Sequence, residues 1–189
     1  MENVAVELLT CPDDKKVVQM DKKVAHMPAL HHIALACKDL EKTHEFYHDV
    51  LGLPLVHTEM DAGPHGGYVK HVFYDLGDGS CIAFFDLHGV GEPPDFSAAI
   101  STGLGLPSWV NHLALRADAA RAAEAKERAT AGGVEVTMEL DHGWCKSVYF
   151  TDPNGILVEF CVDSPGFVPN EDEALRLLHS TPGGVGGAG

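Results

Sequence analysis

Large apolar residues alternate with small or polar residues in the segment HHIALAC, residues 31–37. Successive side chains of a strand point to opposite faces of a sheet, so His32 and Ala34 would share one face. Ile33 and Leu35 would share the other, which has the character of a face packed against a helix. The pattern therefore predicts a strand with one face that lines a space instead of filling a core.

The same alternation recurs in the segment NHLALRA, residues 111–117. There His112 and Ala114 would share one face, opposite a face of leucines. We expect His112 to hold the position in its strand that His32 holds in the earlier one, while His31 points outward.

The two strands open two copies of one repeated unit. After its strand, each copy has an Asp at the expected N-cap of a helix and a Gly at the expected C′ position, 20 residues after the strand histidine. These residues are Asp39 and Gly52 in the first copy, and Asp118 and Gly132 in the second. Three further predicted strands follow in each copy: HTEM, YVKHVFYDLG and SCIAFFDL, then VEVTMEL, KSVYFTD and GILVEFCV.

The repeat predicts an α+β fold of paired βαβββ modules. We expect one domain over residues 29–163, with modules at 29–87 and 109–163 joined by a linker at 88–108. Residues 1–28 would form an N-terminal extension in which VAVELLT could add an edge strand. Residues 164–189 would hold a short helix at EDEALRLLH and a mobile Gly-rich tail.

The last predicted strand places a carboxylate on the cavity side. Alternation in ILVEFCV puts Ile156 and Val158 opposite Glu159. A single strand histidine is more often a core or surface residue than a metal ligand. Here, however, three positions that are predicted to face the cavity carry His32, His112 and Glu159. Two imidazoles and one carboxylate form the facial set that holds Fe(II) with open positions, and the set also suits Mn(II) or another divalent ion.

The paired modules, opened by HHIALACKDLEKTHEFYHDVLGLPLV and closed by SVYFTDPNGILVEF, resemble the vicinal oxygen chelate superfamily over residues 29–163. The resemblance implies that the modules form a curved mixed sheet around a metal cavity. That superfamily includes glyoxalase I, fosfomycin-resistance transferases, bleomycin-resistance proteins and extradiol dioxygenases. The resemblance implies that glyoxalase-like members have a fourth metal ligand, on the last strand of the first module. Aligning SCIAFFDL with GILVEFCV puts Phe84 at that position, and a phenyl ring cannot bind a metal. The remaining three ligands resemble those of extradiol dioxygenases and, less closely, fosfomycin transferases.

Three residues are candidates for acid/base or substrate contacts. Tyr149 stands ten residues before Glu159, a spacing similar to that of extradiol enzymes, although the tyrosine could instead be a wall residue. His142, in the turn before the same strand, has a side chain suited to proton transfer near neutral pH, or it is a surface turn histidine. His71 is a third candidate, but the alignment pairs it with Lys146, which would turn it away from the cavity. Ser80 and Cys81 stand where two-domain extradiol enzymes keep an acid/base histidine.

The composition of the chain disfavours some classes of binding partner. The net charge of −15, with no block of Lys and Arg, disfavours nucleic acid and anionic membranes as partners. No spanning segment or secretory signal is visible and the five cysteines form no CxxC pair, so we expect a cytoplasmic protein with reduced thiols.

The predicted function is an Fe(II)-dependent extradiol-type dioxygenase that cleaves a catechol-like aromatic with O2, and we expect a homodimer. Two alternatives stay open at this point. One is a glyoxalase-like or fosfomycin-resistance-like metal-dependent isomerase, lyase or transferase. The other is a non-catalytic protein that binds a small molecule.

Overall fold

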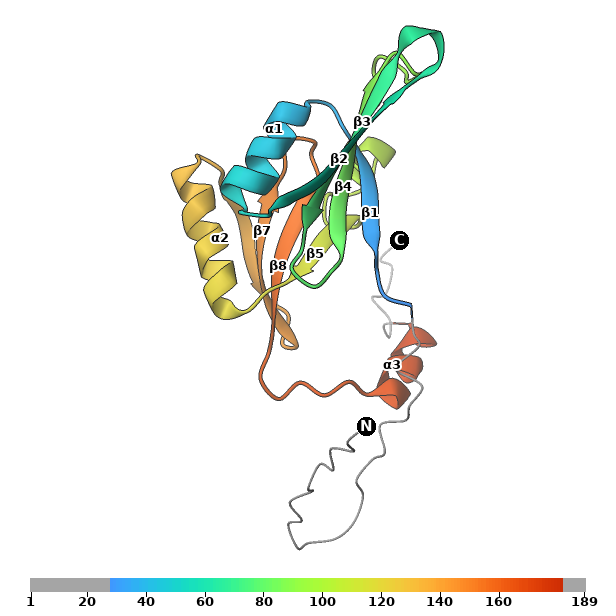
Figure 1. The fold of residues 1–189 in the computed structure, drawn as a ribbon. Helices are drawn as coiled ribbons and strands as arrows, with labels where there is room; N and C mark the ends of the chain where they lie inside the picture. The colour runs from blue at the N-terminus through green and yellow to red at the C-terminus, as the bar shows by residue number, and fades with distance from the viewer. Residues whose placement is uncertain (1–27, 182–189) are drawn as a thin grey trace, which may run out of the picture. The chain divides into compact units, whose positions relative to one another are not determined.

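The computed structural model describes residues 28–181 (Figure 1). The predicted edge strand VAVELLT and the Gly-rich tail lie outside these residues. The described residues from His31 onward form one compact unit, to which every element below belongs. Among the described helices, none is long and apolar enough to cross a membrane.

Both copies of the repeat fold as βαβββ modules, which confirms the predicted α+β class (Figure 1). Each module has its own four-stranded mixed sheet, with the orders β1-β4-β3-β2 and β5-β8-β7-β6. The first module comprises β1 (His32–Cys37), α1 (Leu40–His44), β2 (Leu55–Ala62), β3 (Tyr68–Asp75) and β4 (Cys81–His88). The second comprises β5 (His112–Arg116), α2 (Ala119–Ala131), β6 (Val136–Asp141), β7 (Cys145–Thr151) and β8 (Leu157–Asp163).

Shorter helical segments complete the chain. α1 continues directly as a π-helical segment, η2 (Glu45–Val50), and 3-10 turns form at η3 (Pro64–Gly66) and η4 (Thr102–Leu104). The predicted C-terminal helix is α3 (Glu171–Leu178), whose N-cap Asn170 accepts a hydrogen bond from the backbone of Glu173.

The predicted helix caps are confirmed, with one shift. The side chain of Asp39 accepts a hydrogen bond from the backbone N–H of Lys42, and that of Asp118 accepts one from Arg121. Gly52 follows the first helix with φ +71°. The prediction for Gly132 is wrong by one residue, because Gly132 is the C-cap with φ −83° and Gly133 takes the left-handed conformation at φ +71°.

The strand register corrects the position equivalent to Glu159. In the parallel pair of β5 and β8, Ala114 stands beside Glu159, and in the pair of β1 and β4, Ala34 stands beside Ala83. Ala83, and not Phe84, is therefore the counterpart of Glu159. The alignment slipped because it matched Ser80 with Gly155, whereas Gly79 and Gly155 are the left-handed glycines that precede the two strands.

Phe84 lies on the helix-covered face of its sheet. It is fully buried, and its ring lies 4.7 Å from that of Tyr47, centroid to centroid. The methyl group of Ala83 cannot bind a metal either, so this position supplies no fourth ligand, and the three-ligand site stays a prediction.

The two modules share one hydrophobic core, to which both helices and the helix-covered faces of both sheets contribute. Polar contacts join the modules as well: the hydroxyl of Tyr47 donates to Asp152 Oδ2 at 3.0 Å, and Arg128 Nε donates to the carbonyl of Val50 at 3.0 Å. Because the core covers one face of each sheet, the opposite faces, with His32 and His112, remain open. Both histidines are exposed in a single copy of the chain.

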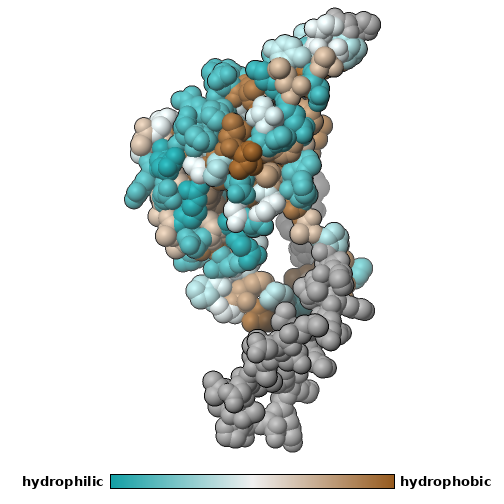
Figure 2. All heavy atoms as spheres, viewed as in Figure 1, coloured by the Kyte–Doolittle hydropathy of each residue, from teal (hydrophilic) through white to brown (hydrophobic). Residues whose placement is uncertain are grey.

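Most of the surface in the view of Figure 2 is hydrophilic, and one group of hydrophobic residues lies near the centre of the domain. The cysteines within the described residues are free thiols, as expected. They are Cys37, Cys81, Cys145 and Cys161.

Candidate functional site

His112 opens β5, and both of its ring nitrogens have a fixed partner. Nδ1 lies 2.9 Å from the backbone carbonyl oxygen of Trp109, and Nε2 lies 2.9 Å from Glu159 Oε2. A carbonyl oxygen only accepts hydrogen bonds, so Nδ1 carries a proton, and Nε2 can either donate a proton to the carboxylate or share a cation with it. The backbone of Trp109 thus fixes the tautomer that a metal ligand needs.

Glu159 is buried in β8, with 4% of its surface exposed. Its second oxygen, Oε1, accepts a hydrogen bond from the hydroxyl of Ser147 on the neighbouring strand β7. Two lone pairs that face each other at 2.9 Å repel unless a proton or a cation lies between them. The pair of His112 and Glu159 therefore fits a divalent cation, with Ser147 orienting the carboxylate.

Tyr149 and His142 form a hydrogen-bonded pair beside His112 and Glu159. Tyr149 stands opposite Glu159 in the ladder of β7 and β8, and its hydroxyl lies 2.9 Å from His142 Nε2. Burial, as the largest cause, and the neighbouring carboxylate of Glu159 raise the pKa of Tyr149 to about 12. The phenol is therefore protonated at neutral pH and can donate a hydrogen bond. The structure brings together His112, Glu159, Tyr149 and His142, which the sequence singled out separately.

A pocket of about 360 Å³ opens at this group. Its walls combine large apolar side chains with the polar groups just described. They are Trp109, His112, Met138, Leu140, His142 and Tyr149.

The sequence analysis missed two residues of this region. Cys145 and Ser147 alternate with Val148 along β7, so both lie on the face of Tyr149. Among the residues that the structure describes, one group of three possible ligands has all its ligand atoms within 4.8 Å of one another, and it joins His142, Cys145 and Glu159. The alternation of KSVYFTD could have indicated Ser147, once Tyr149 was placed on the cavity face.

His32 lies on the open face of the other sheet, as predicted, but among side chains of its own module. Its Nδ1 is 2.8 Å from Nδ1 of His31, and its ring centroid is 5.5 Å from that of Phe73 and 6.1 Å from that of His71. It does not belong to the one three-residue ligand group found in the described part of the chain. The predicted set of three ligands is thus not assembled within 4.8 Å in a single copy.

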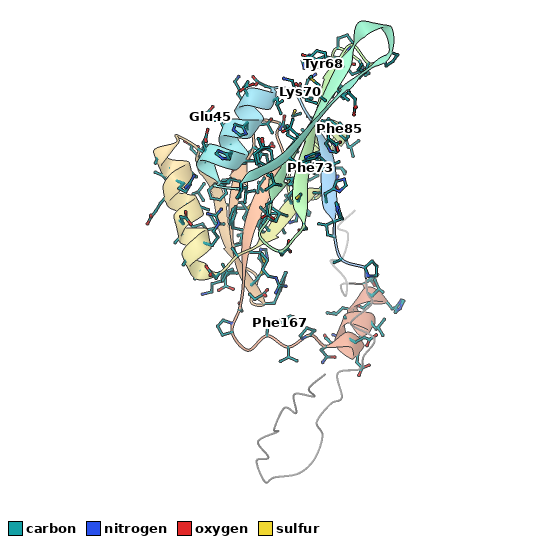
Figure 3. The ribbon with its side chains drawn as sticks, in the orientation of Figure 1. Glu45, Tyr68, Lys70, Phe73, Phe85 and Phe167 are labelled. Atoms are coloured by element: carbon teal, nitrogen blue, oxygen red, sulfur yellow. The ribbon has the colours of Figure 1, made fainter. Side chains whose placement is uncertain are left out.

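His71 lies on the face of His32, so the prediction that it turns away is wrong. In the ladder of β3 and β4 it pairs with Phe85, on whose ring it stacks at 3.7 Å between centroids, and it is the counterpart of Ser147, not of Lys146. Figure 3 labels Phe85 on β4 and Phe73 on β3, the aromatic neighbours of His71.

The imidazole of His71 is held with one nitrogen free. Nδ1 lies 3.7 Å from a carboxylate oxygen of Glu59, while Nε2 is buried and has no hydrogen-bond partner in the described part of the chain. Burial lowers the pKa of His71 below its ordinary value, against the opposing effect of Glu59. A buried neutral imidazole with a free lone pair can accept a proton or bind a metal.

The sequence matches one family model over most of its length. Residues 29–160 match the family model described as the Glyoxalase/Bleomycin resistance protein/Dioxygenase superfamily. No curated protein matches the sequence at a significant level.

Solved structures share the fold. The genomically encoded fosfomycin resistance protein FosX of Listeria monocytogenes is 25% identical, with 74% of this chain and 96% of that chain covered and a TM-score of 0.52. A glyoxylase/bleomycin resistance protein/dioxygenase domain from Frankia sp. is 17% identical, with 73% and 99% covered and a TM-score of 0.55. The antibiotic binding protein TnmS3 of Streptomyces sp. is 19% identical, with 74% and 98% covered and a TM-score of 0.51.

Proposed function

The chain belongs to the glyoxalase/bleomycin resistance protein/dioxygenase superfamily, and from this premise we propose that it is an Fe(II)-dependent extradiol-type dioxygenase acting on a catechol-like aromatic. The observation that carries the proposal is the pair of His112 and Glu159, 2.9 Å apart, beside a protonated Tyr149 and an apolar pocket. The pair fits a divalent cation, and its surroundings fit an uncharged aromatic ring.

His112, Glu159 and His32 would hold the metal. Two imidazoles and one carboxylate leave positions free for exchangeable ligands, which a fourth protein ligand at Ala83 would reduce. Iron, when bound, would supply the redox chemistry that lets a catechol react with O2. Mn(II) is the second metal that this donor set suits.

Two copies of the chain would complete the site. The shared core covers one face of each sheet. The opposite faces, which carry His32 and His112, are therefore both available for contact with a second copy of the chain. A homodimer with two-fold symmetry would bring His32 of one copy against His112 and Glu159 of the other, twice.

Tyr149 and His142 would accept the proton that the substrate loses on binding. A catechol must lose a proton to bind as an anion, and His142 Nε2 can take it through the hydroxyl of Tyr149, 2.9 Å away. His71, with its unpartnered Nε2 on the face of His32, is the second candidate base. Ser147 would keep Glu159 in position and does not itself contact the substrate.

The surrounding charges favour a neutral substrate over a phosphonate. None of the described residues that line the pocket is Lys or Arg. Arg116, on the same face of the sheet, is paired with Asp163 at 3.1 Å. A fosfomycin-resistance-like transferase would need cations for its anionic substrate, so this alternative takes second place together with a glyoxalase-type isomerase.

The test is oxygen consumption by reconstituted protein. Protein loaded with Fe(II) without air should bind a catechol, and admitting air should consume O2 in proportion to a yellow ring-opened product. Zn(II)-loaded protein is the control and should be inactive, because zinc has no redox chemistry. If a panel of catechols gives no oxygen uptake, while Zn(II) or Mn(II) protein isomerises a hemithioacetal or opens an epoxide, the alternative replaces the dioxygenase.

Mixing two inactive variants tests the two-copy site. In a dimer of His32→Ala with His112→Ala, one site carries both substitutions and the other carries neither, so random mixing should restore about a quarter of the wild-type metal occupancy and activity. Each variant alone should stay inactive. If the mixture also stays inactive although the two variants exchange subunits, the ligands come from one chain.

A further inference from the structure

The turn between β6 and β7 holds His142 and Cys145 in a fixed relation. The backbone N–H of His142 donates to the carbonyl oxygen of Cys145 at 2.9 Å, and Asp141 Oδ1 accepts a hydrogen bond of 2.8 Å from the backbone of Gly143. Gly143 has φ +81°, a left-handed conformation that glycine adopts at little cost. The backbone of this turn therefore sets the distance between the imidazole-bearing and the thiol-bearing residue.

Glu159 on β8 completes a group with these two residues. Ligand atoms of His142, Cys145 and Glu159 all lie within 4.8 Å of one another. Bonds of ~2.0–2.3 Å to a tetrahedral metal put two donor atoms of one site ~3.3–3.8 Å apart, so the donors need to close by no more than ~1.5 Å. His142 is exposed and can make this movement by giving up its hydrogen bond with Tyr149, whereas Cys145 and Glu159 are buried.

The donor atoms of this group differ from those of the proposed iron site. Two imidazoles and one carboxylate would hold the iron through nitrogen and oxygen alone, whereas Cys145 adds a sulfur. A thiolate favours a thiophilic ion such as Zn(II), and cysteine, histidine and carboxylate side chains are the ones that bind zinc in proteins. Three protein ligands would leave the fourth tetrahedral position to water.

The two sets of donors share Glu159. Its Oε2 faces His112 at 2.9 Å, and its Oε1 accepts the hydrogen bond of Ser147, whose hydroxyl oxygen is 3.6 Å from Cys145 Sγ. A cation on the side of Cys145 would therefore bind Oε1 in place of the Ser147 hydroxyl. Two divalent cations on one carboxylate repel each other, so an ion at Oε1 would weaken the binding of iron at Oε2.

We infer that His142, Cys145 and Glu159 form a second metal site, for Zn(II) or another thiophilic divalent cation, and that its occupation inhibits the enzyme. On binding, the metal replaces the proton of the Cys145 thiol, and this proton leaves to solvent. Inhibition follows because the ion takes His142 from Tyr149 and competes with iron for Glu159. The metal site is independent of the proposed reaction, and only the inhibition rests on the proposed dioxygenase function.

Cobalt tests the site without an enzymatic assay. Co(II) on a thiolate has a sulfur-to-metal charge-transfer band in the near ultraviolet, which Co(II) on nitrogen and oxygen ligands lacks. In metal-free His112→Ala protein, which lacks the proposed iron site, this band should saturate at about one Co(II) per chain with release of about one proton per ion. Cys145→Ser in the same background should abolish the band, and Cys81→Ser, which removes a thiol of the first module, is the control that should retain it. No band in the His112→Ala protein, or a band that persists in Cys145→Ser, would overturn the site.

A second variant covers the case in which Cys145→Ser fails to fold. His142→Ala keeps the thiol, so the band should still form at saturation, but Co(II) should bind at least ~tenfold more weakly because one direct donor is lost. Far-ultraviolet circular dichroism should match that of the wild type. Unchanged affinity in His142→Ala would remove the imidazole from the site and overturn the inference.

Zinc tests the inhibition. Zn(II) added to Fe(II)-loaded wild-type protein should lower oxygen uptake, and equal inhibition of Cys145→Ser should need at least ~tenfold more Zn(II), because the sulfur donor is gone. Cys81→Ser should be inhibited like the wild type. Equal sensitivity of Cys145→Ser and the wild type would mean that zinc only replaces iron, and it would reject the inhibitory role. If catechols cause no oxygen uptake while the cobalt band behaves as expected, the dioxygenase proposal fails and the second metal site stands.

Discussion

His112 and Glu159 face each other across two neighbouring parallel strands, with Nε2 and Oε2 2.9 Å apart and the other nitrogen of His112 fixed on a backbone carbonyl. The strands that carry them pair directly, so the distance between the two side chains is set by the sheet and not by flexible loops. A cation at this point replaces the proton that the bare pair would need.

Loss of either side chain should release the metal. His112→Ala and Glu159→Ala should each weaken binding of a divalent metal by at least ~100-fold, because each removes one direct donor from a set of three. His31→Ala is the control, since His31 neighbours His32 but lies outside the proposed ligand set. Metal content after dialysis and calorimetric titration measure the effect, and an equal loss from His31→Ala contradicts the assignment.

The counterpart of Glu159 can be tested by adding a ligand. Ala83→Glu should bring a fourth ligand, a second carboxylate, to the face of His32, so it should lower oxygen-dependent turnover while metal stays bound. Ala83→Gln is the control of equal size without charge, and it should retain more activity. If both variants lose activity equally, crowding and not coordination is the cause.

Phe84→Glu should behave differently from Ala83→Glu. Phe84 is fully buried against Tyr47, so a carboxylate there leaves a cavity and an unpaired charge in the core. We expect the free energy of unfolding in urea to fall by at least ~3 kcal/mol. Retained stability together with a changed metal site would restore the original alignment of the two modules.

The sequence correctly predicted the features that depend on local spacing. It misplaced residues whose position depends on the register of distant strands. The caps at Asp39 and Asp118 and the faces of His32 and His112 follow from neighbouring residues alone. Ala83 and His71 were misplaced because the alignment of β3 and β4 with β7 and β8 slipped by one residue, which exchanges the two faces of both strands. In SCIAFFDL, with apolar residues on both faces, nothing in the hydrophobic pattern reveals such a shift.

The separation of His32 from Glu159 had a different cause. Repeat symmetry indicates which positions are equivalent in the two modules, but it does not indicate whether the open faces meet within one chain or between two. That choice depends on which faces pack into the shared core, a tertiary property that the alternation of single strands leaves open. Ser147 was missed for the related reason that its partner, Glu159, lies on another strand.

Tyr149 and His142 should act as one unit. Tyr149→Phe and His142→Ala should each lower kcat by ~10², because each breaks the same path for the substrate proton. The double variant should lose little more than either single variant, since residues that act together are not additive. Tyr68→Phe, at the exposed first residue of β3, is the control, and full additivity in the double variant would indicate two separate roles.

The hydrogen bond between Tyr47 and Asp152 should stabilise the contact of the two modules. Tyr47→Phe removes a donor at 3.0 Å from a buried carboxylate, so the free energy of unfolding should fall by ~1–3 kcal/mol. Chemical denaturation measures the change, with Tyr68→Phe again as the exposed control. A change within the error of that control would show that the shared apolar core alone joins the modules.

Alkaline pH should destabilise the protein through its buried tyrosines. Burial raises the pKa of Tyr149 to about 12, and burial also raises the pKa values of Tyr47 and Tyr74 above the ordinary range. In the unfolded chain these phenols ionise near pH ~10, so above that pH the unfolded state binds fewer protons than the folded state. The free energy of unfolding should therefore fall as pH rises from ~10 towards 12, and the tyrosinate absorbance of folded protein should lag behind that of protein in denaturant. Over this pH range, the free energy of unfolding of Tyr149→Phe should fall less than that of the wild type. An equally steep fall in both proteins would contradict the raised pKa of Tyr149.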